Sequence, residues 1–184
     1  MEKVIIETPL TEEKVSRLKC GDMVLITGTI YTARDAAHQR MMKSLTENKE
    51  LPIDLQDAII YYAGPTPARP GNVSGSFGPT TSSRMDKMTT PLLDKGLKGM
   101  IGKGLRSFEV IESIKKNNAV YFAAIGGAGA LISNAIKKIE VIAYDDLGTE
   151  AVRKLYVEKF PVVVAIDCYG NNIYEKGIQT YKTE

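Results

Sequence analysis

Residues 23–31, Met-Val-Leu-Ile-Thr-Gly-Thr-Ile-Tyr, are rich in β-branched side chains and lead directly into the polar stretch 32–38, Thr-Ala-Arg-Asp-Ala-Ala-His. This composition predicts a strand that ends at a turn. A helix is expected to follow from about Arg34 to Lys49, with an arginine in its first turn. The segment therefore predicts one strand-and-helix unit with polar chemistry at the point where the strand ends.

The same alternation of strand and helix continues along the chain. The stretch 149–157 is expected to be helical. Four further apolar runs are predicted to be strands: 58–63, 119–125, 139–143 and 161–166. Strands interleaved with helices favour a compact α/β fold with a mixed sheet flanked by helices. We expect residues 1–184 to form a single domain.

The overall composition is that of an ordinary globular protein, with 43% hydrophobic and 25% charged residues. The net charge is only +2 and no block of like charges occurs, so nucleic acid is not a favoured partner. No apolar run approaches the roughly 18 residues that cross a membrane, and a membrane role is not expected. The first residues form no apolar signal segment, and we expect a cytoplasmic location.

The metal-binding capacity of the chain is small. Its two cysteines, Cys20 and Cys168, are far apart and form no CxxC motif, and the sequence contains one histidine. Zinc and iron–sulfur sites need three or four such ligands. We therefore expect no metal ligand on this chain.

The sequence Gly-Pro-Thr-Thr-Ser-Ser-Arg-Met-Asp at 78–86 places four hydroxyl side chains before an arginine. A helix is expected to start near Thr80, with its unpaired N–H groups facing an anion. Arg84 is four residues further on and would share a helix face with Thr80. Thr81 follows Thr80 in the same hydroxyl-rich turn. The alternative is a Ser/Thr-rich helix cap with a solvent-exposed arginine.

Two more cations lie in positions that suggest an anionic ligand. Arg34 is expected at the positive end of a helix dipole, where a cation is unfavourable unless an anion neutralises it. Lys103 lies between Gly102 and Gly104, which would let the backbone approach a ligand closely. Both residues have a structural alternative as surface cations, and His38 has one as a buried structural histidine.

A second glycine-rich segment, Gly-Gly-Ala-Gly-Ala-Leu-Ile at 126–132, resembles a dinucleotide-binding fingerprint. The position of its third glycine is occupied by Ile132, and the segment comes late in the chain. We interpret it as a strand-to-helix turn that needs close packing. Nucleotide binding is the alternative.

Several motifs occur in a fixed order along nearly the whole chain. They are TGTIYTARDAAH (27–38), YYAGPTP (61–67), GPTTSSRMD (78–86), GMIGKG (99–104), GGAGAL (126–131) and DxxGN (167–171). Together they resemble the C-terminal domain, or separate β subunit, of class I fumarate hydratases. This family of iron–sulfur hydro-lyases also includes L-tartrate dehydratase. The resemblance implies a swivelling β/β/α domain.

The resemblance also implies roles for individual residues. Thr80 matches the family threonine that is proposed as the catalytic base. Three cations match the contacts of a dicarboxylate substrate: Arg34, Arg84 and Lys103. Four neighbours are expected beside them in the same pocket: Thr32, Asp35, His38 and Thr81. Three cations suit a substrate with two carboxylates that becomes more anionic when a proton leaves its carbon.

The resemblance finally implies a partner. Family members use a 4Fe-4S cluster held by three cysteines, and this chain has only Cys20 and Cys168. The cluster is therefore expected on a separate α subunit, with the active site between the two chains. The expected reaction is reversible hydration of fumarate to L-malate. The alternatives are the β subunit of L-tartrate dehydratase and a non-catalytic module that binds small anions.

Overall fold

The structure is a computed structural model that describes residues 3–68, 70–71, 73–124 and 129–175. Seven strands form one sheet, and helices pack around it. In chain order the elements are β1 (Val4–Glu7), α1 (Glu12–Ser16), β2 (Met23–Thr32), α2 (Asp35–Thr46), β3 (Ile59–Tyr61), η1 (Ser82–Met85), α3 (Asp86–Leu93), β4 (Gly99–Gly102), α4 (Phe108–Lys116), β5 (Val120–Ala123), α5 (Gly129–Ala135), β6 (Ile136–Ala143), η2 (Asp145–Glu150) and β7 (Val152–Ile166).

The sheet is mixed, as the sequence predicts. Strands β1 to β5 pair in parallel in chain order, whereas β7 runs antiparallel to β2, β5 and β6. Because β7 is 15 residues long, it reaches all three of these partners. The pairings β2–β3–β4–β5–β7 return to β2, so this part of the sheet closes on itself.

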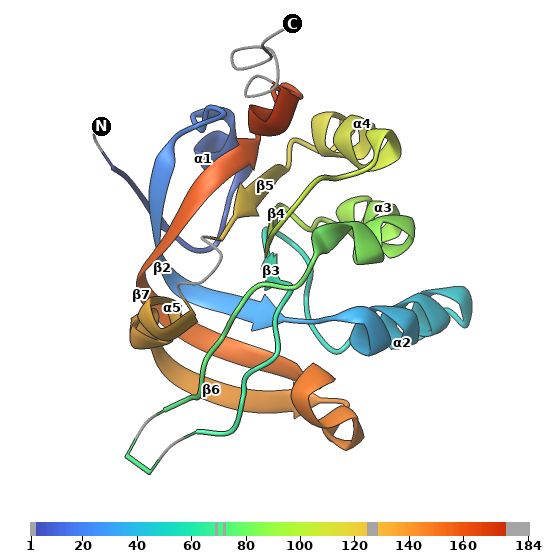
Figure 1. Cartoon of the computed structure of the whole chain (residues 1–184). Coiled ribbons are helices and arrows are strands. Elements are labelled where there is room, and N and C mark those ends of the chain that lie inside the picture. Colours follow the sequence, from blue (N-terminus) through green and yellow to red (C-terminus); the bar gives the residue numbers. More distant parts are fainter. Residues whose placement is uncertain (1–2, 69, 72, 125–128, 176–184) are drawn as a thin grey trace, which may run out of the picture.

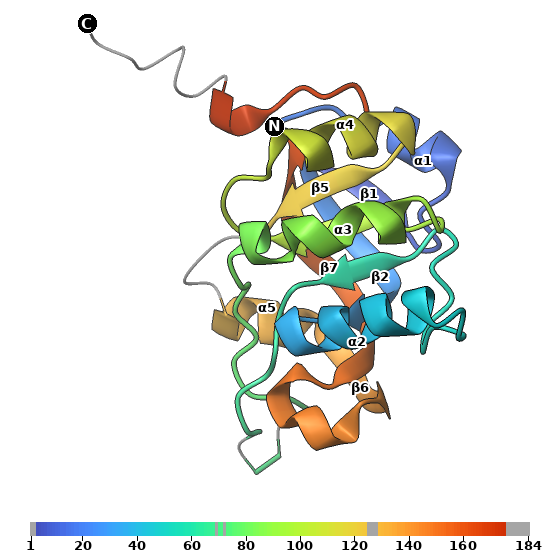
Figure 2. The ribbon, with the colours of Figure 1, turned by 90° about the vertical axis from the view of Figure 1, so that its right-hand side faces the viewer.

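Both faces of the central strands are buried. In β3 and the residue after it, Ile59 and Tyr61 belong to one hydrophobic cluster, and Ile60 and Tyr62 belong to a second. The second cluster includes buried side chains of α2, α3 and α4, which lie side by side against one face of the sheet (Figures 1 and 2). Burial on both faces explains why these strands are continuous apolar runs in the sequence.

The expected helix at 149–157 is wrong. Residues 145–150 form the short 3-10 helix η2, and Val152 begins the long strand β7. Val152, Leu155 and Val157 are buried beside exposed or half-buried neighbours, which is a strand pattern. The period is interrupted near Lys159, whose φ of 51° marks an irregularity in the pairing with β2.

Candidate active site

The predicted site residues follow the ends of three neighbouring parallel strands. β2 ends at Thr32, β3 at Tyr61 and β4 at Gly102, so the segments that follow them share one edge of the sheet. In α/β folds, open or closed, ligands characteristically bind at the carboxyl ends of the parallel strands. The fold therefore brings together strand ends that are 29 to 70 residues apart in the sequence.

The Thr-Thr-Ser-Ser segment extends the sheet at this edge. Thr80 donates its N–H to the carbonyl of Tyr62 (2.7 Å), and its own carbonyl accepts from the N–H of Lys103 (3.3 Å). Ser82 in turn donates to the carbonyl of Lys103 (2.9 Å). The helical turn begins at Ser82, two residues later than expected, because the backbone groups of Thr80 pair with those at the strand ends.

A network of ion pairs joins two of the predicted motifs. Arg84 Nε donates to Asp35 Oδ1 at 2.8 Å. Arg34, at the N-cap position of α2, has its terminal nitrogen 4.0 Å from Asp35 Oδ2 and 3.8 Å from Glu150 Oε1. Arg84 is half exposed, whereas Arg34, Asp35 and Glu150 are each about three-quarters buried. Three of the eight predicted residues are thus in direct electrostatic contact.

Several polar groups at this edge lack a partner among the described residues. Arg34 Nε and Asp35 Oδ2 are buried and make no hydrogen bond there. The side chains of Thr80, Thr81 and Lys103 likewise have no hydrogen bond or ion pair within the described part of the chain. An unpaired donor at a buried position is costly. Arg34 Nε, a buried donor, is therefore suited to an additional anionic ligand, and the partly or fully exposed side chains of Thr80, Thr81 and Lys103 are available to it. Asp35 Oδ2 is an acceptor and would instead need a donor.

Thr32 and His38 lie beneath this edge and are fully buried. Thr32 Oγ1 accepts a hydrogen bond from the N–H of Arg153 (3.3 Å). His38 Nδ1 is 2.9 Å from the carbonyl of Arg34, and because a carbonyl only accepts, Nδ1 carries the proton. Burial lowers the pKa of His38 to about 4, so its ring is neutral at pH 7. Both side chains contact the backbone that carries the site.

Sequence reasoning missed a buried ion pair below the site. Arg106 Nε donates to Asp86 Oδ1 (2.6 Å), and its guanidinium lies over the rings of Tyr62 and Tyr121. The second oxygen of Asp86 accepts from the N–H of Ser107 (2.7 Å), at the start of α4. The only sequence signal was an arginine directly before a helix cap. Its partner is 20 residues away, so local patterns do not reveal the pair.

A chain of hydrogen bonds connects the segment of Thr80 with the segment of Lys103. The hydroxyl of Tyr121 donates to the carbonyl of Gly104 (2.9 Å) and lies 2.9 Å from Ser82 Oγ. Since the single phenolic proton goes to Gly104, Ser82 is the donor to Tyr121. Gly102 makes room for this contact, because a Cβ there would lie 1.9 Å from Ser82 Oγ. The position of Lys103 is thereby tied to that of Thr80.

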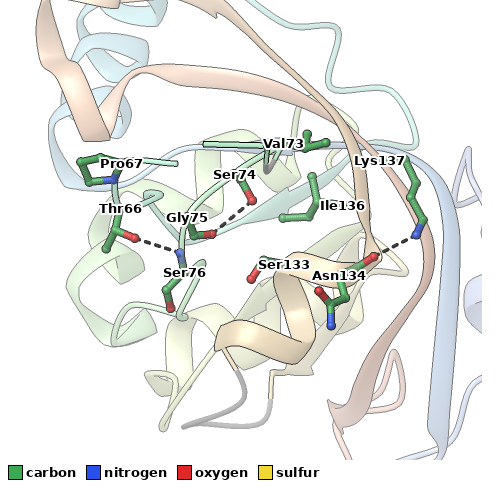
Figure 3. A pocket seen from close by; sticks show the side chains of 11 residues that line it. Thr66, Pro67, Val73, Ser74, Gly75, Ser76, Ser133, Asn134, Ile136 and Lys137 are labelled. Carbon is green, nitrogen blue, oxygen red and sulfur yellow. Dashed lines mark hydrogen bonds between the residues drawn. The ribbon is translucent and has the colours of Figure 1, made fainter. Parts of the chain in front are cut away.

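The loop after β3 runs away from the candidate site. Residues 66, 67, 71 and 73–76 line a hollow of about 570 Å³ together with α5 and the start of β6 (Figure 3). Lys137 Nζ, at its rim, donates to the carbonyl of Asn134 (2.9 Å). None of the eight predicted site residues lines this hollow. The candidate site lies instead at the carboxyl ends of β2, β3 and β4, which we call the open edge of the sheet.

The described residues do not fit an iron–sulfur cluster. Cys20 and Asp167 are hydrogen-bonded near the end of β7, which pairs with the start of β5 and so lies at the opposite edge of the sheet. Burial raises the pKa of the Cys168 thiol, which disfavours the thiolate that binds iron. Within the described ranges, no three His, Cys, Asp or Glu side chains are grouped to hold a metal ion.

Two further sequence interpretations concern the glycine-rich segment and the membrane. Residues 126–128 of the glycine-rich segment lie outside them, so its interpretation as a turn stays a prediction. The helices within the described part of the chain include none that is long and apolar enough to span a membrane.

The fold defines an α/β protein with a mixed sheet, and a cation-rich candidate site lies at the carboxyl ends of its parallel strands. Comparison with known proteins assigns its family. The family model "Fumarase C-terminus" matches residues 1–177, and the chain belongs to this family. The resemblance in the sequence motifs is thereby confirmed.

Relatives carry the names of two kinds of hydro-lyase. A Methanocaldococcus jannaschii protein named "Putative L(+)-tartrate dehydratase subunit beta" is 40% identical over 91% of this chain and 89% of its own length. Fumarate hydratase 1, mitochondrial, of Leishmania major is 39% identical over 94% of this chain but only 32% of its own length. The anaerobic class I fumarate hydratase of Escherichia coli is 37% identical over 95% and 32%, respectively. The chain thus spans about a third of the fumarate hydratases that it matches.

Proposed function

We propose that this chain is the β subunit of a class I fumarate hydratase that hydrates fumarate reversibly to L-malate. The substrate would bind between this chain and an α subunit that carries a 4Fe-4S cluster. The observation that carries the proposal is a set of groups without a partner among the described residues, namely Arg34 Nε, the Lys103 ammonium and the Thr80 and Thr81 hydroxyls, at one edge of the sheet in a member of the fumarase C-terminus family. This edge is open, as a surface completed by a partner would be.

The cations would hold the two carboxylates of the substrate. Arg84 uses Nε for Asp35, which leaves its two terminal nitrogens for bidentate contact with a carboxylate. Arg34 offers its unpaired Nε, and Lys103 offers an ammonium group without an acidic partner among the described residues. These three side chains would orient the substrate and stabilise the charge that develops when a proton leaves carbon.

Thr80 is the proposed base for that proton. Its backbone is hydrogen-bonded on both sides, to Tyr62 and to Lys103, so its Cα has a defined position at the edge. A threonine hydroxyl is a weak base and needs nearby positive charge to stabilise the alkoxide, which Lys103 and Arg84 would supply. The cluster on the partner would contribute Lewis-acid chemistry at the substrate hydroxyl. This chain would bind, orient and move the proton.

Turnover assays test the proposal directly. L-Malate turnover is measured anaerobically with this chain alone and with a cluster-reconstituted α chain from the same source. We expect activity only in the mixture. Thr80→Val keeps the shape of the side chain and should lower kcat by about 100-fold, the usual contribution of a general base. Ser83→Ala, an exposed hydroxyl in the same motif, is the matched control. Equal kcat values for the two variants would remove Thr80 from the mechanism.

A second candidate is dehydration of L-tartrate. It is favoured by the matching length of the M. jannaschii relative, which this chain covers over 89% of its length. The same mixture is assayed with L-tartrate. A higher kcat/KM for tartrate than for malate would assign the second activity to the same residues. Turnover of neither substrate with an intact cluster would instead favour a module that only binds small anions.

A further inference from the structure

Glu150 connects two parts of the site that are far apart in the sequence. It ends η2, the turn between β6 and β7, which lies next to α2 in both views (Figures 1 and 2). Glu150 Oε2 accepts a hydrogen bond from the N–H of Ala36 at 2.8 Å. Its other oxygen, Oε1, is 3.8 Å from the terminal nitrogen of Arg34. One carboxylate therefore contacts both the helix and the cation that precedes it.

The contact with Ala36 replaces a missing helix cap. Arg34 occupies the N-cap position of α2, and its side chain makes no capping hydrogen bond. The first N–H groups of a helix need outside acceptors, and a negative charge there is favoured by the helix dipole. Glu150 supplies both the acceptor and the negative charge from a turn that is distant in the sequence. The direction in which the chain enters α2, and with it the backbone of Arg34, thus depends on Glu150.

The turn that carries Glu150 is itself held in place. The Arg153 guanidinium donates to the carbonyls of Gly148 (2.6 Å), Thr149 (3.0 Å) and Ala151 (3.1 Å). Gly64, three residues after the end of β3, packs closely against the same turn, since a Cβ there would lie 2.4 Å from the Thr149 carbonyl oxygen and 3.5 Å from Arg34 Cδ. Glu150 is therefore presented by a clamped backbone rather than by a loose loop.

We propose that Glu150 is a positioning residue for Arg34. One oxygen fixes the first turn of α2, and the other draws the terminal nitrogen of Arg34 to one side. This leaves the buried Arg34 Nε, which has no partner among the described residues, directed to a ligand. Glu150 acts only through Arg34 and Ala36. The catalytic consequence rests on the proposed function, whereas the positioning itself does not.

The first experiment measures positioning without any activity. Hydrogen exchange of the Arg34 Nε–H is followed by ¹⁵N NMR in the full chain, with the resonance assigned from Arg34→Lys. Glu150→Gln keeps an oxygen for Ala36 but removes the charge that faces Arg34. We expect exchange at least fivefold faster in Glu150→Gln and an unchanged rate in Asp146→Asn, which removes a charge from the same turn. Equal rates in wild type and Glu150→Gln, with both folded, would overturn the proposal.

The second experiment is a double-mutant cycle in the complex with the α chain. Glu150→Gln is expected to lower kcat/KM for L-malate about tenfold through a higher KM. Its effect should disappear in the Arg34→Lys background but persist in the Lys103→Met background. The proposal would be overturned if the double variant lost kcat/KM by the product of the two single losses, because the two residues would then act independently. If the wild-type complex turns over no dicarboxylate, the proposed function fails, and the exchange rate of Arg34 Nε–H still decides the role of Glu150.

Discussion

Two arginine–aspartate pairs extend from the same motif, and both use the arginine Nε. Arg84 contacts Asp35 at the open edge, at 2.8 Å, with 52% of the Arg84 side chain exposed. Asp86, two residues later, contacts Arg106 at 2.6 Å, with none of the Arg106 side chain exposed. The buried arginine also donates to Thr89 Oγ1 (2.8 Å). At the open pair, Asp35 Oδ2 is buried without a hydrogen-bond partner among the described residues.

The difference separates a scaffold from a site. A buried ion pair is tolerated where further hydrogen bonds satisfy both partners, and Asp86 and Arg106 have such bonds to Ser107 and Thr89. An open pair with unsatisfied neighbours contributes little to stability, and its groups are available to a ligand. The buried pair of Asp86 with Arg106 therefore holds α3 and α4 in place. The open pair of Asp35 with Arg84 offers charge at the edge that these helices support.

The largest expected effect breaks the buried pair. Arg106→Met leaves the Asp86 carboxylate buried without its cation, which should lower the free energy of unfolding by about 3–5 kcal/mol. Arg84→Met removes the exposed partner and should cost less than about 1 kcal/mol. Urea denaturation of the two variants measures both changes. Similar losses of unfolding free energy in the two variants would show that burial does not make the Asp86–Arg106 pair the more important one for stability.

The pH dependence of stability tests burial beneath the open edge. The pKa of His38 is lowered from 6.5 to about 4, chiefly by burial, against weaker opposing effects of the Arg34 carbonyl and Asp35; Arg106 lowers it further. The unfolded chain takes up a proton below pH 6.5 that the folded chain accepts only near pH 4. The free energy of unfolding should therefore fall by about 3 kcal/mol as the pH drops through this window.

His38 is the only histidine of the chain, so its contribution can be isolated. Denaturation of the wild type and of His38→Gln is compared at pH 7 and at pH 5. The variant should show a smaller loss, because the carboxylates that also titrate are common to both proteins. Identical losses would mean that His38 is not held neutral by burial. The NMR titration of its single ring gives the pKa directly.

A smaller effect is expected where Gly102 packs against Ser82. Gly102→Ala places a Cβ 1.9 Å from Ser82 Oγ, and the resulting shift should cost about 1–3 kcal/mol in thermal denaturation. Gly78→Ala is the matched control, since a Cβ there meets no heavy atom within 4 Å. Adding Ser82→Ala should recover part of the loss. No recovery would mean that the Ser82 hydroxyl is not the group that requires a glycine at position 102.

The sequence predicts what is local at this edge and misses what is not. Apolar runs predict β2, β3 and β5, and glycines on both sides of Lys103 indicate an approach to a ligand. The ion pair of Arg106 with Asp86 and the contact of Glu150 with Ala36 join residues 20 and 114 positions apart. Such contacts depend on which strand ends lie side by side. The second part of β7 was predicted as the strand 161–166, whereas its first part was predicted as a helix. The charged residues in that first part hide the strand pattern until the neighbouring strands are known.

The smallest effect concerns Thr32, which lies between scaffold and site. Its hydroxyl is fully buried and accepts from the Arg153 N–H at 3.3 Å, so Thr32→Val removes that hydrogen bond at nearly equal side-chain volume. The free energy of unfolding should fall by about 1 kcal/mol. The KM for the dicarboxylate in the complex should change by less than about twofold, since burial keeps the hydroxyl from the ligand. A large rise in KM at unchanged stability would place Thr32 with Arg84 at the open edge rather than with Arg106 in the scaffold.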